Sequence, residues 1–169
     1  TLPTSSAYSD VYKRQADRKL TSDSGWKPRF RDSELKSFIA KTNELNCRTS
    51  LFINADIESV EYASEMNFDR IEIYTGPFAH AYLLNKNELQ INCDKIKEVI
   101  DRAHDLELGV NAGHDLSLDN IEVLKSCGLV DEVSIGHAIM TDSLKYGFDD
   151  TIIKSVSYTH LRAHETILD

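Results

Sequence analysis

Short apolar segments alternate with helical patterns through the middle of the chain. Four segments rich in apolar and β-branched residues are bounded by polar residues or glycine, which is typical of strands. They span 49–55, 69–75, 107–113 and 131–136. Apolar residues recur at helical spacing over 33–45, 57–66, 94–106 and 118–124. This alternation predicts parallel strands joined by right-handed helical crossovers, and therefore an α/β fold.

Helix-start residues support the same division of the chain. Asp56, Asp94 and Ser117 are expected to cap helices or to lie in their first turns. Residues 76–90 are expected to form a loop, with Tyr74, Phe78 and Tyr82 packing around it. The run Asp149–Asp150 is expected to begin a solvated helix. Four strand–helix units fit either half of an eight-stranded barrel or most of a doubly wound open sheet.

Small and polar residues follow each predicted strand, and two of these junctions are Gly-His pairs. No G-x-G-x-x-G follows the first strand and no P-loop motif occurs, so neither dinucleotide nor P-loop chemistry is indicated. Gly113–His114 and Gly136–His137 stand where ligands bind in parallel α/β folds. Glycine allows an oxyanion to approach the backbone, a following helix offers free N–H groups, and an imidazole can donate a proton. The pairs predict a phosphate site.

The two ends of the chain look unrelated to the rest. Residues 10–15 read DVYKRQ, the translation of GAT GTG TAT AAG AGA CAG, which resembles the transposase recognition end of sequencing-library adaptors. The reverse complement of that DNA, in a shifted frame, encodes VSYTH at 156–160. We therefore expect 1–15 and 156–169 to be non-native and 16–155 to be the native domain. On this interpretation the cluster His160, His164 and Glu165 is not a metal site.

Composition restricts the partners. A net charge of −9 argues against nucleic acid, and the apolar runs fall far short of the roughly 20 residues that span a bilayer. No secretory signal opens the chain, so we expect a cytoplasmic protein that binds small molecules or other chains. Cys47, Cys93 and Cys127 lack C-x-x-C spacing and are expected to be free thiols.

Several motifs together resemble the pyridoxine 5'-phosphate synthase family. They are SLFINAD, RIEIYTGPFA, LGVNAGHDLSLDNI and DEVSIGHAIMTDSLKYG, in that order along 19–153. The resemblance implies a (β/α)8 barrel of which this chain is the C-terminal half, from the loop after strand four to the start of the final helix. The opening strands would then be missing. The family is cytoplasmic, forms homo-oligomers and needs neither metal nor organic cofactor.

The resemblance also implies a reaction. The family, which belongs to the transferases of vitamin B6 biosynthesis, condenses 3-amino-1-hydroxyacetone 1-phosphate with 1-deoxy-D-xylulose 5-phosphate. The products are pyridoxine 5'-phosphate, inorganic phosphate and water. His114 matches the family's proton donor, Gly136 and His137 match its phosphate site, and Thr21 matches a substrate-binding threonine. Asp115 stands where family members usually have a glycine whose backbone contacts substrate.

Other interpretations remain open at this point. A different phosphate-binding barrel enzyme, of the epimerase or aldolase type, or a non-catalytic half-barrel module would also place Gly-His pairs after strands. Glu72 is expected to be a barrel-interior carboxylate rather than one of the family's early-strand catalytic groups, and His80 and His104 are expected to be structural. A half barrel leaves two open strand edges and an uncovered apolar inner face, so this chain is expected to self-associate and to lack turnover.

Overall fold

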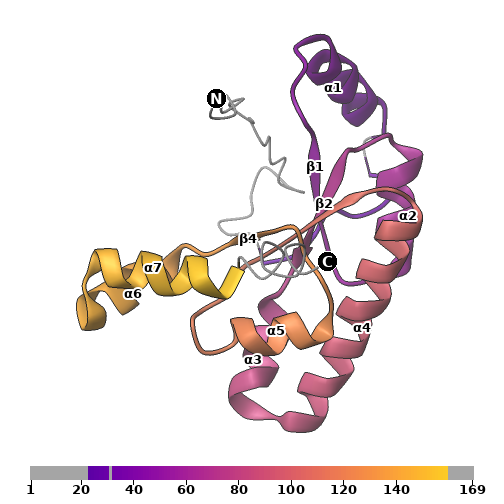
Figure 1. Ribbon diagram of the computed structural model, residues 1–169. Coiled ribbons are helices and arrows are strands. Elements are labelled where there is room, and N and C mark those ends of the chain that lie inside the picture. The colour runs from indigo at the N-terminus through magenta and orange to yellow at the C-terminus, as the bar shows by residue number, and fades with distance from the viewer. Residues whose placement is uncertain (1–22, 31, 160–169) are drawn as a thin grey trace, which may run out of the picture.

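A four-stranded parallel sheet forms the centre of the structure, a computed structural model that describes residues 23–30 and 32–159 (Figure 1). The strands are β1 (Ser50–Ile53), β2 (Arg70–Tyr74), β3 (Gly109–Gly113) and β4 (Glu132–Ser134). They pair in the order β1-β2-β3-β4, and every pairing is parallel. The predicted strands and the α/β class are therefore confirmed, each strand being somewhat shorter than its apolar segment.

Seven helices surround or extend the sheet within the described part of the chain. They are α1 (Asp32–Glu44), α2 (Ile57–Glu65), α3 (Gly76–Leu84), α4 (Lys86–Asp105), α5 (Ile121–Cys127), α6 (His137–Tyr146) and α7 (Phe148–Thr159). The expected loop over 76–90 is wrong, because α3 and the first turn of α4 occupy it. Pro77 lies in the first turn of α3, where its missing N–H costs no helical hydrogen bond.

Alternate residues of the strands build the apolar core. Leu51, Ile53, Ile71, Ile73, Val110 and Ala112 are all at most 4% exposed. They belong to one cluster with buried residues of α2 and α4, including Val60, Ile96, Val99 and Ile100. Because strand side chains alternate between faces, this cluster defines the helix-covered face of the sheet. Figure 1 shows α2 and α4 lying side by side there.

The opposite face of the sheet is polar, contrary to the expected apolar inner face. Arg70, Glu72 and Asn111 alternate with the core residues and are at most 9% exposed. Arg70 donates from Nε and Nη2 to Oδ1 of Asn111, at 2.9 and 2.6 Å, and pairs with Asp131 at 3.2 Å. Buried charged and amide groups are kept here because they bond to one another.

Of the three predicted helix starts, one is confirmed and two are wrong. Asp56 is the N-cap of α2, and its Oδ1 accepts from the N–H of Ser59 at 2.8 Å, as expected. Asp94 lies well inside α4, which begins eight residues earlier behind the cap Asn85. Ser117 is not a cap either, since α5 begins after Asn120.

Two cysteines also depart from expectation. Cys93 of α4 and Cys127 of α5 form a disulfide with Cα atoms 4.9 Å apart. Cys47 is free, as predicted. The expectation of free thiols is therefore wrong for the Cys93–Cys127 pair, which joins two helices on the same side of the sheet. Its sequence separation of 34 residues hid it from motif reasoning.

The last two helices project away from the sheet (Figure 1). They pack mainly on each other, and α6 contains no buried residue. Asp149 and Asp150 lie in the first turn of α7, as the sequence predicts. Among the described residues, no helix is both long enough and apolar enough to cross a membrane.

Candidate functional site

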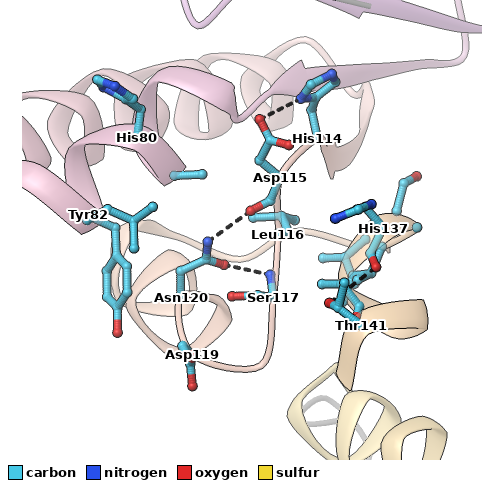
Figure 2. Close-up of a pocket in the computed structure, with 17 residues that line it drawn as sticks. His80, Tyr82, His114, Asp115, Leu116, Ser117, Asp119, Asn120, His137 and Thr141 are labelled. Atoms are coloured by element: carbon cyan, nitrogen blue, oxygen red, sulfur yellow. Dashed lines mark hydrogen bonds and ion pairs between the residues drawn. The ribbon is translucent and has the colours of Figure 1, made fainter. Parts of the chain in front are cut away.

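A cavity of about 950 Å³ opens at the carboxyl ends of β3 and β4. It is lined by residues of α3, of the loop between β3 and α5, of the β4 end and of the first turns of α6 (Figure 2). Helix termini and loop backbone meet here because all strands run in the same direction. Both Gly-His motifs are at this cavity: His114, Gly136 and His137 line it.

His114 directly follows β3 and is held by its backbone. The Thr75 hydroxyl, fully buried at the end of β2, lies 2.7 Å from the Gly113 carbonyl oxygen and 2.6 Å from that of His114. The N–H of Thr75 also donates to Gly113 at 2.9 Å. The Tyr74 ring meets the imidazole edge-on, with centroids 5.0 Å apart. The side chain stays 29% exposed, so a ligand can reach it.

Asp115 turns its carboxylate toward His114. Its Oδ2 lies 3.0 Å from Nδ1 of the imidazole, while the side chain remains 60% exposed. Figure 2 shows this carboxylate directed to His114 and away from His137. The carboxylate is therefore turned toward the imidazole of the same loop instead of facing the start of α6.

The rest of the loop is fixed by Asn120. Its Oδ1 accepts from the Ser117 N–H at 2.9 Å, and its Nδ2 donates to the Asp115 carbonyl at 3.0 Å (Figure 2). Asn120 is 4% exposed, and Leu116 beside it is 1% exposed. The amide therefore bridges both ends of the turn that presents Asp115. The sequence did not single out Asn120, although an Asx residue just before a helix was an available signal.

Gly136 and His137 begin α6. Gly136 is the N-cap, and a Cβ placed on it would meet no atom within 4 Å. The N–H groups of the first helical turn lack intrahelical acceptors, and the helix dipole favours an anion there. His137 is exposed and lines the cavity. A phosphate-sized anion at this end would have backbone donors and an imidazole within the same turn.

Helix α3 supplies a wall that the sequence analysis did not foresee. His80 and Tyr82 line the cavity from this helix, whereas both were expected in a structural loop (Figure 2). Phe78 is 1% exposed and packs in the core, as predicted. His104 lies on α4, exposed and outside the cavity. Thr21 lies outside the described residues.

Glu72 lies one strand away from His114, on the polar face of the sheet. It is 5% exposed, which agrees with the interior position expected for it. It pairs in register with Asn111, and a Cβ on Gly113 would collide with its Oε1. A side chain at position 113 would therefore displace the Glu72 carboxylate, so Gly113 leaves room for a close approach of that group.

Among the described residues, no group of three or more His, Cys, Asp and Glu side chains is arranged to hold a metal ion. The titratable groups that line the cavity include three imidazoles (His80, His114 and His137) and two carboxylates (Asp115 and Asp119), and the first turn of α6 adds backbone N–H groups. These groups can bind an anion and move a proton.

Comparisons with known proteins identify the family of this chain. The family model described as pyridoxal phosphate biosynthesis protein PdxJ matches residues 14–160. Two relatives are named pyridoxine 5'-phosphate synthase, one from Bacteroides thetaiotaomicron and one from Flavobacterium johnsoniae. Each is 42% identical to this chain over 79% of the chain's length. A third of that name, from Christiangramia forsetii, is 42% identical over 81%. The chain spans 55–57% of the length of these three curated relatives. By the extent of the family match, this chain belongs to the PdxJ family of pyridoxal phosphate biosynthesis proteins.

Proposed function

We propose that the protein to which this chain belongs is a pyridoxine 5'-phosphate synthase. The observation that carries the proposal is that Gly136, His137 and His114, from two separate Gly-His motifs, line one cavity at the strand ends. Three curated relatives of 42% identity carry that enzyme's name. The substrates are 3-amino-1-hydroxyacetone 1-phosphate and 1-deoxy-D-xylulose 5-phosphate, as the family resemblance implies.

The residues divide between binding and proton transfer. Backbone N–H groups at Gly136 and His137 hold a substrate phosphate at the N-terminus of α6. His114 donates protons to oxygens that leave during loss of water and phosphate, because an imidazole exchanges protons near neutral pH. Asp115 and Thr21 complete the proposed substrate-binding set, Thr21 from outside the described residues.

The whole-protein architecture belongs to the same proposal. Four parallel strands in sequential order, with helices on one face, are compatible with the C-terminal half of a (β/α)8 barrel. The native domain is 16–155, between adaptor-like ends at 1–15 and 156–169. The polar face carrying Arg70 and Glu72 is then the barrel interior. The complete protein is a homo-oligomer that uses no metal or organic cofactor.

The decisive experiment uses the complete protein. Recovering the upstream DNA of the source and expressing the full-length product should give an enzyme that forms pyridoxine 5'-phosphate and inorganic phosphate from the two substrates. The 169-residue chain alone should show no turnover. A complete protein that binds both substrates without forming the ring would overturn the proposal.

A matched pair of histidine variants tests the role of His114. In the full-length enzyme, His114→Gln should lower kcat by roughly 10²- to 10⁴-fold, the usual contribution of a positioned acid, with a smaller change in KM. His104→Gln is the control, because His104 is exposed on α4 and lies outside the cavity. Equal activity in the two variants would remove His114 from the mechanism.

A further inference from the structure

We infer that Asp115 is a positioning residue that holds the His114 imidazole with Nδ1 inward, so that Nε2 faces the ligand. The inference rests on the proposed function for its catalytic meaning, and on the geometry of the loop for its physical content. The family resemblance supplies no role for this side chain, because family members usually have glycine at the position.

The backbone brings the two side chains together. His114 has φ of 92° and Asp115 has φ of 56°, both in the region that side-chain-bearing residues rarely adopt. Aspartate and histidine tolerate this region better than most residues, but the conformation still costs free energy unless the surroundings hold it. Thr75 supplies that restraint, because its N–H donates to the carbonyl of Gly113 and its hydroxyl bonds to the carbonyl of His114. Two successive positive φ values bend the chain so that Asp115 faces back onto His114.

The surroundings of the imidazole distinguish its two nitrogens. Nδ1 is buried and, among the described residues, has no neighbour that meets hydrogen-bond geometry, although Asp115 Oδ2 lies only 3.0 Å away. The contact is therefore electrostatic and off the direction of an ideal N–H···O bond. A carboxylate beside a buried ring nitrogen favours a proton on that nitrogen. Nε2 is left to exchange a proton with a ligand.

The same contact solves a charge problem in the cavity. A carboxylate beside a phosphorylated substrate would repel it if it pointed into the anion site. Directed at His114 instead, it faces away from His137 and the N-terminus of α6 (Figure 2). Asn120 holds the Asp115 carbonyl and so fixes the direction of the side chain. Asp115 thus orients the imidazole without blocking the proposed phosphate position.

The test reads the tautomer of His114 directly in the ligand-free 169-residue chain. Imidazole ¹⁵N chemical shifts of His114 report which nitrogen carries the proton in the neutral ring. The unmodified chain should hold one dominant tautomer, protonated at Nδ1. Asp115→Asn, which keeps the shape and loses the charge, and Asp115→Gly, which restores the family residue, should both give a mixture of tautomers.

Asp119→Asn is the matched control for this measurement. Asp119 belongs to the same loop and lines the same cavity, but it forms no ion pair with His114. Its removal should leave the His114 tautomer unchanged. If both Asp115 variants keep the tautomer population of the unmodified chain, the inference is wrong. The inference is also wrong if Asp119→Asn shifts the His114 tautomer population as much as the two Asp115 variants do.

A kinetic measurement separates this inference from the proposed function. In the full-length enzyme, Asp115→Asn should lower kcat by about tenfold, the lower end of what losing a carboxylate partner costs a functional histidine, with KM nearly unchanged. If the full-length enzyme makes no product, the proposed function fails while the tautomer result stands. If the enzyme is active and Asp115→Asn changes only KM, the positioning role fails while the proposed function stands.

Discussion

Backbone angles of single residues separate structural positions from functional ones in this chain. Positive φ values occur at Asn46, Asn67 and Glu107, which lie two residues after the last residues of α1, α2 and α4, respectively. Residues after a helix commonly adopt this conformation to satisfy its last carbonyl groups. His114 and Asp115 follow a strand instead, where no such need exists. Their strain is explained by what they present to the cavity.

Tyr62 gives a prediction at this scale for the dependence of stability on pH. Its hydroxyl donates to Oδ1 of Asp32 at 2.6 Å and joins α2 to α1. Burial, and then the bond to Asp32, raise the pKa of Tyr62 from 10.0 to about 12. The folded state therefore keeps a proton that the unfolded state loses. The stabilisation is fully present below pH 10 and is lost as the pH rises through about 12.

Urea unfolding of Tyr62→Phe measures this effect. The variant should be less stable than the unmodified chain by about 1 to 3 kcal/mol below pH 10, because Asp32 loses its partner. The difference should shrink as the pH approaches 12. Tyr82→Phe, which alters a half-buried tyrosine at the cavity wall, is the control and should not change the pH dependence. A difference that grows with pH would contradict the assignment.

At the scale of elements, the sequence predicted the strands and helices that carry a recognisable pattern in their own residues. Strands β1, β2 and β3 were recognisable because each buries alternate apolar residues, and α2 because Asp56 caps it; β4 only half-buries Val133. Helix α3 was missed because it is apolar on both its buried and its exposed sides, with Phe78 at 1% and Leu83 at 77% exposure. No helical periodicity can be read from such a segment.

The candidate site shows the same division. His114, Gly136 and His137 were predicted because strand ends meet at one edge of a parallel sheet, and they do line one cavity. His80 and Tyr82 were not predicted because their positions depend on α3. The direction of the Asp115 side chain depends on two backbone angles and on Asn120, which no local pattern encodes.

The cap of α2 gives a prediction at the element scale. Asp56→Ala removes the acceptor for the Ser59 N–H and should destabilise α2 by about 1 kcal/mol, the usual cost of losing an N-cap. Amide hydrogen exchange at Ser59 should accelerate relative to that in α4. Glu58→Ala is the control, because Glu58 is an exposed acid in the first turn of α2, whereas the capping bond is accepted by Asp56. Equal exchange at Ser59 in both variants would show that the cap contributes nothing.

For the molecule as a whole, packing is uneven. The helix-covered face of the sheet is closed by α2 and α4, whereas α6 contributes no buried residue and contacts mainly α7. Met140, Leu144, Phe148 and Ile153 on these two helices are 58–91% exposed. The sheet also ends on both sides, at β1 and at the three-residue β4. Exposed apolar side chains and sheet edges both favour association with another chain.

Self-association of the 169-residue chain is therefore expected, with the α6–α7 pair as the main contact. In sedimentation velocity the apparent mass should rise above 19.1 kDa as the concentration increases. Burying a leucine contributes about 1.5 to 3 kcal/mol, so Leu144→Lys should weaken association at least about tenfold. Leu45→Lys is the matched control, because Leu45 is 71% exposed but lies beyond the end of α1, far along the chain from α6. If the chain stays monomeric at every concentration, these exposed apolar surfaces do not drive association and the prediction is wrong. If Leu144→Lys and Leu45→Lys weaken association equally, the α6–α7 pair is not the main contact. Each lysine would then act only through the charge that it adds.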